Sequence, residues 1–364
     1  MTSIALLSTA VSPLGLGKGG GVEKDIIKFA DLLTDRHWDV DIYCPEGSKA
    51  NTKGRLIPCK GKLEAPAQYL DSRRHLLPTN SFLFHALKTL AIHRNLYSLI
   101  INFSYDWLPF YQSFFFEIPV LHYLSICSHT KEMDEIIKTV SETFHNSVAV
   151  LNQEQAETYQ GLSLENICRL GYGIKLDDYP FSSEHEEFVA WAGRIAPEKG
   201  LEDALEFSER SGTRLKIFGY IQDETYWREL QKRFAAAPFS YEGFLPSDQL
   251  PHAFQKAKAL LFTTKKSEAL GIVILEAMAC GVPVIAYDNP GPRHILSKGP
   301  AGFLVTDKNA ASLINVYQNI GQVKRETCRR LVEEHFAQSG WENKSIAWVH
   351  GQLHPDKLPE PMVW

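Results

Sequence analysis

The chain has 364 residues, which is longer than one ordinary hydrophobic core and predicts two domains. Apolar residues make up 44% of it and charged residues 22%, the balance of a globular enzyme. The net charge of −5 and the pI near 6.2 argue against a nucleic acid as its partner.

The cysteines and the apolar runs indicate a compartment. The six cysteines are scattered without C-x-x-C spacing, so they predict neither a zinc site nor a disulfide framework. We therefore expect a reducing cytoplasm, and no signal peptide, because residues 4–10 follow no basic segment. Charges and prolines interrupt the apolar stretch 99–126. No membrane span is expected there, while peripheral membrane contact and the oligomeric state stay open.

The first half of the chain predicts a parallel α/β sheet. Residues 3–9 indicate a buried strand, and a Gly-rich loop, an amphipathic helix over 22–35 and a strand over 39–43 follow. Further strands are expected over 97–103, 119–125, 147–151 and 167–171, with helices over 80–94 and 133–143. Residues 59–78 show no pattern that assigns them to an element.

A polar, acidic and turn-rich stretch after Gly173 predicts a linker to a second α/β series. The expected domains are 1–173 and 174–340. Strands are expected over 188–192, 214–218, 239–243, 259–263, 282–287 and 302–305, and helices over 270–280, 310–320, 324–337 and 341–351.

Glycines gather between the first strand and the first helix. Gly15 to Gly20 fit the G-x-G-x-x-G pattern, but five residues separate Gly15 from the strand, whereas a dinucleotide site wants its first glycine directly after it. The other interpretation places Gly19 and Gly20 at the helix N-terminus, where backbone N–H groups can approach a phosphate or a sugar.

Asp39-Val40-Asp41 imitates the D-x-D motif of metal-dependent glycosyltransferases. A strand that buries Val40 would leave both aspartates facing solvent at a sheet edge. We predict no metal there.

The stretch 263–291 carries the most chemistry. It predicts a polar loop, a helix that is apolar on nearly all sides, and a buried strand. Glu276 lies inside this helix, where a lone buried charge is costly. Glu276 either forms an internal ion pair or lies at a helix edge that reaches water, or its carboxylate accepts hydrogen bonds from ligand hydroxyls.

A second carboxylate, Glu268, precedes Glu276 by eight residues. Between them lie the free N–H groups of the first helical turn, which favour an anion. A carboxylate, an anion site and another carboxylate in one line suit a sugar, a diphosphate and a ribose. The residues expected to offer these N–H groups are Leu270, Gly271, Ile272 and Val273.

Two cations lie in the segment 193–200, GRIAPEKG, which follows a strand and opens a helix. The Arg194 guanidinium can bind two oxygens of a diphosphate, and the Lys199 ammonium adds a point charge. By itself the segment is a common surface pattern.

Together these features resemble the retaining family 4 glycosyltransferases. Glu268 and Glu276 match the family's E-x7-E motif, and the flanking EALGIVILEAMACGVPVIA is similar to it throughout. GRIAPEKG resembles its G-R-x4-K-G element, and Gly19 to Glu23 resemble its G-G-x-E entry. Gly243, Phe244 and Leu245 match the loop that holds the nucleotide base through backbone groups.

The resemblance implies the GT-B fold, with two Rossmann-like domains facing a cleft and a last helix, about 341–364, that returns to the N-terminal domain. It also implies metal-independent, retaining transfer of a hexose from UDP-glucose to a small acceptor, without a cofactor beyond the nucleotide sugar. Arg194 and Lys199 would stabilise the diphosphate, Glu276 would hold the ribose and Glu268 the sugar hydroxyls. Residues 3–23 further resemble the UDP-glucose:tetrahydrobiopterin glucosyltransferase type.

One position departs from the family pattern. Members carry a histidine about six residues after the proline that opens the strand at 119–125, and here Ser125 occupies that place. The nearest histidines are His122 and His129. His122 either points into the cleft, where it would fix the donor sugar, or is a core histidine.

Two other functions stay open. A nicotinamide-dependent oxidoreductase would use the Gly15–Gly20 loop, bind NAD and ignore UDP. A catalytically silent nucleotide-sugar sensor, suggested by Ser125, would bind the sugar nucleotide without turnover.

Overall fold

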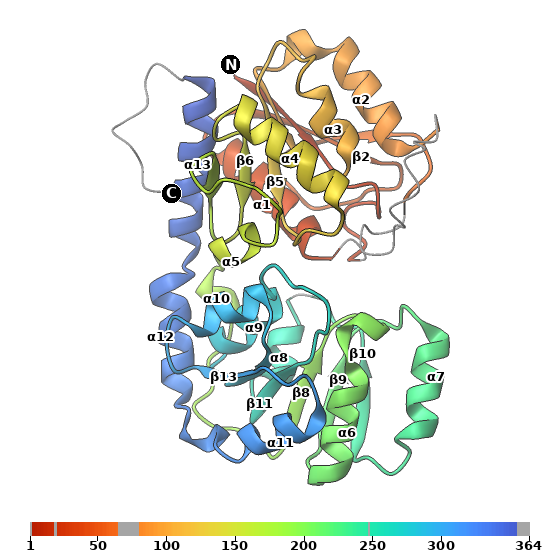
Figure 1. Cartoon of the computed structure of the whole chain (residues 1–364), viewed down its shortest axis with the longest axis vertical. Coiled ribbons are helices and arrows are strands. Elements are labelled where there is room, and N and C mark those ends of the chain that lie inside the picture. Colours follow the sequence, from red (N-terminus) through yellow and green to blue (C-terminus); the bar gives the residue numbers. More distant parts are fainter. Residues whose placement is uncertain (1, 18–19, 65–79, 247, 355–364) are drawn as a thin grey trace. The chain divides into compact units, whose positions relative to one another are not determined.

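The computed structural model describes residues 2–17, 20–64, 80–246 and 248–354 (Figure 1). Its contacts divide the chain into two units. One unit is Met1–Gly171 together with the chain from Glu342 onward, and the other is Tyr172–Trp341. Each unit has one parallel sheet covered by helices, which confirms the expected pair of Rossmann-like α/β domains.

The N-terminal unit contains a seven-stranded parallel sheet in the order β3-β2-β1-β4-β5-β6-β7. Its strands are β1 (Ser3–Leu7), β2 (Asp39–Pro45), β3 (Arg55–Cys59), β4 (Leu99–Asn102), β5 (Val120–Leu124), β6 (Val148–Val150) and β7 (Ile167–Arg169). Its helices are α1 (Gly21–Asp35), α2 (Phe82–Ile92), α3 (Trp107–Gln112), α4 (Lys131–Thr143), α5 (Gln153–Ala156) and most of α13 (Gln338–Leu353).

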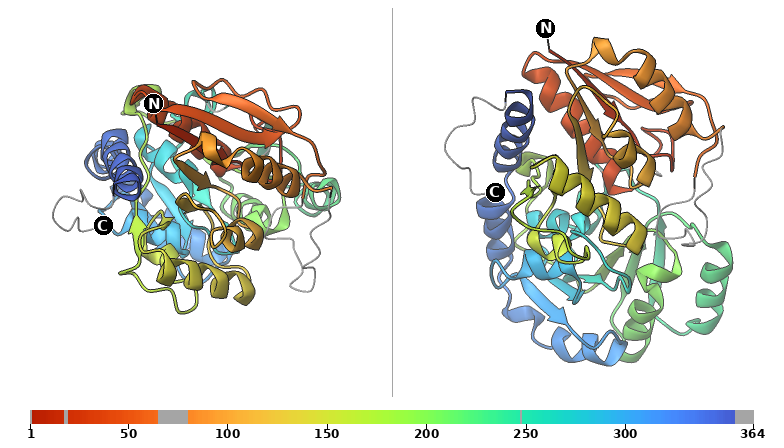
Figure 2. Two further views of the ribbon diagram at one scale, coloured as in Figure 1. Left: turned by 90° about the horizontal axis from the view of Figure 1, so that it is seen from above. Right: turned by 45° about the horizontal axis from the view of Figure 1, so that its top comes forward.

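Helices cover both faces of this sheet. Side chains of α2, α3 and α4 pack on one face, and α1 and α13 lie on the other (Figure 2). On the second face the ring of Phe29 contacts the rings of Tyr123 and Trp348, at centroid distances of 5.1 and 6.4 Å. The Trp348 indole also donates to the Asn146 carbonyl at 2.6 Å. The last helix therefore completes the core of the first domain.

The C-terminal unit contains a six-stranded parallel sheet in the order β10-β9-β8-β11-β12-β13. Its strands are β8 (Val189–Ala192), β9 (Leu215–Phe218), β10 (Phe239–Gly243), β11 (Ala259–Phe262), β12 (Val284–Tyr287) and β13 (Gly302–Val305). Its helices are α6 (Leu201–Ser211), α7 (Glu224–Arg233), α8 (Leu250–Phe254), α9 (Ile272–Ala279), α10 (Pro290–Leu296), α11 (Ala310–Tyr317) and α12 (Arg325–His335).

In each sheet the chain first adds strands on one side of the first strand and then continues on its other side. This switch point lies between β1 and β4 in one sheet and between β8 and β11 in the other. In a parallel α/β sheet the loops after two such strands lead to opposite faces, which leaves room for a ligand at their carboxyl ends. In the N-terminal unit those loops are the Gly-rich loop and residues 103–106. In the C-terminal unit they are residues 193–200 and 263–271.

Strand β3 and helix α9 are among the elements that differ from expectation. Strand β3 was not expected, because it is short and largely exposed and contains Pro58, which is tolerated only because β3 is an edge strand. Helix α9 begins at Ile272 rather than at residue 270, because Gly271 has a left-handed conformation with φ 83°. Most of the unassigned stretch 59–78 lies outside the described residues.

Among the helices that the structure describes, none combines the length and the apolar composition needed to cross a membrane.

Candidate functional site

The switch point of the C-terminal sheet brings two of the expected site residues together. Lys199 lies in the loop after β8 and Glu268 in the loop after β11. The Lys199 ammonium is 2.7 Å from Glu268 Oε2, and the two side chains are 20% and 25% exposed. The pair is thus reachable from solvent and partly shielded from it.

Buried contacts fix the two loops against each other. The Trp191 indole donates to Thr263 Oγ1 at 2.9 Å, and this hydroxyl donates to the Lys199 carbonyl at 3.1 Å. Gly200 has φ 66°, and a Cβ there would overlap the Thr263 carbonyl oxygen. A glycine is therefore required for the close approach that sets Lys199 beside Glu268.

Arg194, the other expected cation, has different partners. Its guanidinium is 3.2 Å from Glu198 Oε1 and donates to Gln222 Oε1. Its side chain is 19% exposed, about as much as that of Lys199, and Glu198 and Gln222 limit the directions in which it can reach a ligand. The structure places Arg194 in the same loop as Lys199 but does not give it the same carboxylate partner.

The N-terminus of α9 follows Glu268 directly. Gly271 is the N-cap, so the N–H groups of Ile272 and Val273 belong to the first turn, whereas Leu270 and Gly271 precede it. This narrows the expected anion site to the first two helical residues. The Gly291 N–H donates to the Glu268 carbonyl at 2.8 Å, which holds the loop in place at the helix entrance.

Glu276 is the fifth residue of α9 and only 3% exposed. At about 1.5 Å per residue it lies about 6 Å along the helix from Ile272. Its side chain shares a hydrogen bond with the Tyr179 hydroxyl, and burial together with the nearby Glu276 raises the pKa of Tyr179. Tyr179 lies in the stretch that was expected to be the linker, and its contact with Glu276 was not predicted from the sequence.

Tyr179 is itself tied to α9. Arg329 Nη1 donates to the carbonyls of Tyr179 and Ala279, at 2.7 and 2.6 Å. The only sequence signal for this contact is one aromatic residue in an acidic, turn-rich stretch.

A glycine follows or ends each of three neighbouring strands at its carboxyl end: Gly193 after β8, Gly219 after β9 and Gly243 at the end of β10. A Cβ at Gly219 would overlap the Gly193 carbonyl, and Gly243 has φ 81° with open space where a Cβ would lie. Tyr241 donates its hydroxyl proton to the Gly219 carbonyl at 2.8 Å. Phe244, with 51% of its surface exposed, stands beside this opening, and Leu245 follows it half-buried.

A carboxylate organises the Gly-rich loop of the N-terminal unit. Glu23 Oε1 accepts hydrogen bonds from the N–H groups of Gly15 and Gly17. Gly20 has φ 74° and caps α1, with open space where a Cβ would lie. Gly19 lies outside the described residues. The Glu23 charge occupies amides that a dinucleotide pyrophosphate would need, which argues against the oxidoreductase.

His122 does not lie at the edge of the sheet, so its proposed role on the donor sugar is wrong for this conformation. It is fully buried, and its ring stacks on Phe110 at 3.9 Å. Its Nδ1 is 3.1 Å from Asn102 Nδ2 and its Nε2 is 2.8 Å from Ser113 Oγ. Because Asn102 Nδ2 can only donate, the ring carries its proton on Nε2. Burial lowers the pKa of His122 to about 3.

The half-buried His129 follows the end of β5 instead. Its N–H donates to the Tyr105 hydroxyl at 3.1 Å, and the two rings are 5.9 Å apart. Of the two histidines considered from the sequence, His129 is the one at the carboxyl edge of the sheet.

Both aspartates of the D-x-D motif were expected to face solvent, but only Asp39 does. Asp41 is buried and binds Arg55 through both carboxylate oxygens, at 2.7 and 2.6 Å. Strand β2 is also interior to the sheet, because β3 covers its outer side. Within the described residues no group of three His, Cys, Asp or Glu side chains is arranged to hold a metal ion.

Residues 177–336 match the model of the family described as glycosyl transferases group 1. D-inositol 3-phosphate glycosyltransferase of Mycolicibacterium smegmatis is 23% identical over 93% of this chain and 88% of its own length. 2-Deoxystreptamine N-acetyl-D-glucosaminyltransferase of Streptomyces fradiae is 32% identical over 34% of this chain, and the match spans 31% of that protein.

Solved structures share the fold over nearly the whole chain. Sucrose-phosphate synthase from Thermosynechococcus elongatus has a TM-score of 0.75 at 21% identity, covering 98% of this chain and 99% of its own. Anabaena HepE in complex with UDP and glucose has a TM-score of 0.77 at 17% identity, covering 96% and 100%. The fold is therefore GT-B, and the match to the family model is confined to residues 177–336. The comparisons give no support to the pterin glucosyltransferase type.

Proposed function

We propose that the protein is a retaining glycosyltransferase that moves a hexose from a nucleotide diphosphate sugar, with UDP-glucose as the expected donor, to a small acceptor. The observation that carries the proposal is the Lys199–Glu268 pair beside the N-terminus of α9, inside the segment that matches the family model. A departing diphosphate gains negative charge, and a fixed ammonium group and N–H donors at that place stabilise the transition state.

Each donor group has a residue of matching chemistry. The diphosphate would accept hydrogen bonds from the N–H groups of Ile272 and Val273, and the positive charges of Lys199 and Arg194 would stabilise it. Glu268 would accept hydrogen bonds from sugar hydroxyls while it orients the Lys199 ammonium.

The nucleoside would bind farther along the same edge. Glu276 would accept hydrogen bonds from the ribose, and the backbone from Gly243 to Leu245 would hold the base. On the N-terminal unit, Gly20 offers backbone that a ligand can approach closely.

The chemistry needs no strong protein base. The bond from the anomeric carbon to the diphosphate oxygen breaks, and its electron pair stays on the diphosphate. The acceptor oxygen attacks from the same side, and its proton passes to the departing phosphate oxygen. Positive charge from Lys199 and Arg194 would serve where other glycosyltransferases use a metal ion. We expect a reducing cytoplasm as the compartment, because the six cysteines are free, buried thiols.

The donor is tested by thermal shift with UDP, UDP-glucose, UDP-N-acetylglucosamine, GDP-mannose and NAD. A ligand at a hundred times its Kd adds about 2.7 kcal/mol of stability. We expect UDP-glucose to stabilise the protein and NAD to have no effect. Stronger stabilisation by GDP-mannose than by UDP-glucose would contradict the donor assignment. Stronger stabilisation by NAD would contradict the assignment as a glycosyltransferase.

Turnover is tested by UDP release from UDP-glucose with 2-deoxystreptamine, D-inositol 3-phosphate and tetrahydrobiopterin as acceptors. The first two are taken from the names of the similar proteins, and the third from the sequence resemblance. We expect an α-linked product by NMR and unchanged turnover in EDTA. A β-linked product would refute retention, and activity lost in EDTA and restored by Mn²⁺ would refute metal independence.

The second candidate is a catalytically silent nucleotide-sugar-binding protein. It is favoured by Ser125 at the expected histidine position together with the burial of His122. Such a protein would be stabilised by UDP-glucose and would release no UDP, either to an acceptor or to water. UDP release above that of a Lys199→Met variant excludes it.

A further inference from the structure

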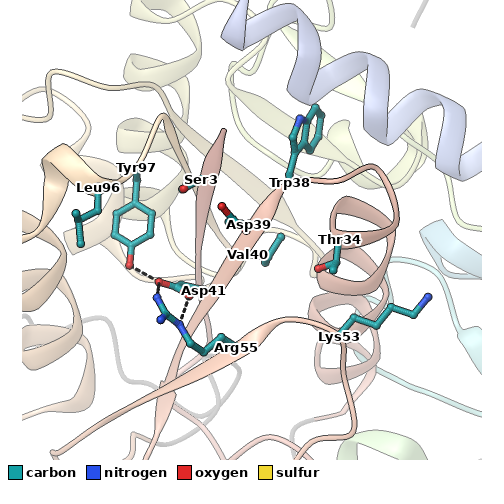
Figure 3. A pocket seen from close by; sticks show the side chains of 10 residues that line it. All are labelled: Ser3, Thr34, Trp38, Asp39, Val40, Asp41, Lys53, Arg55, Leu96 and Tyr97. Carbon is teal, nitrogen blue, oxygen red and sulfur yellow. Dashed lines mark hydrogen bonds and ion pairs between the residues drawn. The ribbon is translucent and has the colours of Figure 1, made fainter. Parts of the chain in front are cut away.

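A pocket of about 540 Å³ opens at the amino ends of β1 and β2 (Figure 3). Ser3 and Asp39 begin these strands, and Tyr97 lies just before β4. The Gly-rich loop and the loop after β4 leave from the opposite, carboxyl ends. The pocket is therefore separate from the edge to which the proposed transferase site belongs, and its volume suits a small molecule.

A closed hydrogen-bond network forms one wall of the pocket. Arg55 binds both oxygens of Asp41, and the Tyr97 hydroxyl donates to Asp41 Oδ2 at 2.7 Å. The Tyr43 hydroxyl lies 3.0 Å from that of Tyr97 behind it. Asp41 already accepts three hydrogen bonds, so it shapes the wall rather than binding a ligand.

Other groups in the pocket remain able to bind. Within the described residues the Asp39 carboxylate and the Ser3 hydroxyl make no hydrogen bond or ion pair. Arg55 uses Nε and Nη2 on Asp41, which leaves the N–H groups of Nη1 as donors. One open carboxylate, one hydroxyl and one guanidinium edge together offer both acceptors and donors.

The charges favour a neutral ligand. Lys53 is 2.5 Å from Asp35, and Arg55 is paired with Asp41, so neither cation is left to balance a bound phosphate or carboxylate. Asp39 would repel an anion, whereas its two oxygens can accept hydrogen bonds from two adjacent hydroxyls.

Aromatic and apolar side chains complete the lining. Leu96 and Tyr97 lie on the side of β2 to which Asp39 and Asp41 point, whereas Trp38 and Val40 lie on its other side (Figure 3). The C–H face of a sugar ring can pack against Leu96 and the Tyr97 ring, while polar groups at the ring's rim receive its hydroxyls. The same residues also give the D-x-D sequence a role: Asp39 and Asp41 lie on one side of β2, one open to a ligand and the other holding the wall.

We propose that this pocket is a second saccharide site that binds a neutral pyranose, with Asp39 on adjacent hydroxyls, Arg55 Nη1 on a further oxygen and Leu96 and Tyr97 on the ring face. The inference goes beyond the proposed transferase activity and does not rest on it. The bound pyranose can be a free sugar or the terminal unit of a longer glycan, which share this chemistry.

The test is ligand-detected NMR on the full chain with saturating UDP, using D-glucose, maltotriose, myo-inositol and glucose 6-phosphate. We expect millimolar binding of D-glucose, with glucose 6-phosphate weaker because no unpaired cation faces the pocket. Maltotriose tighter than D-glucose identifies a glycan end, and equal binding identifies a free sugar. Binding of glucose 6-phosphate tighter than D-glucose, or no wild-type signal from either glucose or maltotriose, refutes the proposal. Equal binding of myo-inositol refutes the preference for a pyranose.

Variants locate the binding. Asp39→Asn, an isosteric change at an exposed residue, and Leu96→Ala, at an exposed apolar residue of the lining, should each weaken sugar binding at least ~10-fold. Glu117→Gln, a matched change at an exposed carboxylate of the same unit, should leave it unchanged. The UDP affinity should be the same in all three. Sugar binding that survives Asp39→Asn would place the sugar elsewhere, most simply beside UDP, and would overturn the proposal even if the protein is a transferase.

Discussion

The two sheets have the same order of their first six strands, yet their carboxyl edges are built differently. In the C-terminal unit, charged side chains from two loops meet across the switch point as the Lys199–Glu268 pair. In the N-terminal unit, Glu23 binds backbone N–H groups of the Gly-rich loop, and His122 of β5 is turned into the core. A diphosphate needs charges at fixed positions, which leave a pattern in the sequence. An edge built from backbone and small polar groups leaves much less of one.

The largest effect is expected at Lys199, on the charged edge of the C-terminal sheet. We expect Lys199→Met to lower kcat by about 10²–10³-fold, because a fixed charge on the departing diphosphate is lost. The measurement is UDP release from UDP-glucose. Lys258→Met is the matched control, since Lys258 precedes β11 at its other end and pairs with Glu187 at 2.8 Å. Turnover within a few-fold of wild type would mean that the charged edge is not the donor edge.

His122 tests the other side of the comparison. We expect His122→Ala to lower the free energy of unfolding by about 2–4 kcal/mol, because it leaves a cavity and removes one hydrogen-bond partner each from Asn102 and Ser113. Turnover measured below the melting temperature should stay near wild type. His129→Ala, at the half-buried histidine, should change stability by less than about 0.5 kcal/mol. A large loss of kcat in His122→Ala without loss of stability would return His122 to the active site.

The protonation of His122 gives an independent measure of its burial. Its pKa is about 3 in the folded protein and near 6.5 when unfolded, so between these values the unfolded chain binds more protons. The His122 contribution to stability is therefore complete above about pH 6.5 and is lost as the pH falls toward 3, by at most ~1.4 kcal/mol per pH unit. Denaturant unfolding at pH 7 and 5 should show a smaller difference for His122→Gln than for wild type. An unchanged difference would contradict the buried, neutral histidine.

A smaller effect is expected at Glu276. If its carboxylate receives ribose hydroxyls, Glu276→Gln should weaken UDP binding by about 1–3 kcal/mol, because a hydrogen bond to a charged group is lost. Calorimetric titration with UDP measures this, and a melting curve measures folding. Unchanged UDP affinity with reduced stability would instead make Glu276 part of a structural contact with Tyr179.

Tyr179 should have the smallest effect. Tyr179→Phe removes the hydroxyl that orients Glu276 and should weaken UDP binding by about 0.5–1.5 kcal/mol, while kcat at saturating donor is unchanged. Tyr317→Phe, on α11 in the same unit, is the matched control. Equal UDP affinity in Tyr179→Phe and wild type would mean that the hydroxyl does not position Glu276, and would leave the donor assignment standing.

The sequence predicted the fold well because central parallel strands are covered on both faces and appear as continuous apolar runs. That same coverage explains the error at His122. In a strand buried on both sides, side-chain alternation does not tell a core residue from a site residue. Recognising His122 as core required α3, whose Phe110 and Ser113 contact its ring, and no helix was expected at Trp107–Gln112.

On the donor side, the sequence allowed us to predict that Lys199 and Glu268 lie in one site, because their loops follow strands on either side of the switch point. Their roles stay predictions. It could not find Tyr179, since its contact with Glu276 depends on Arg329, which is far along the chain and holds the linker against α9. Gly271 was expected inside the helix, because a glycine's left-handed conformation is not visible in an apolar run.

The last helix has a consequence for how the chain folds during synthesis. Residues of α13 from Glu342 onward belong to the N-terminal unit, and Trp348 packs on Phe29. At ~5–20 residues per second, the ribosome adds these residues roughly 10–35 s after it has finished the strands of that unit. During this interval the nascent first domain presents an uncovered apolar face to chaperones. Folding of the first domain is therefore completed only after the second domain has been synthesised, and a premature stop codon near residue 340 would damage the domain that was made first.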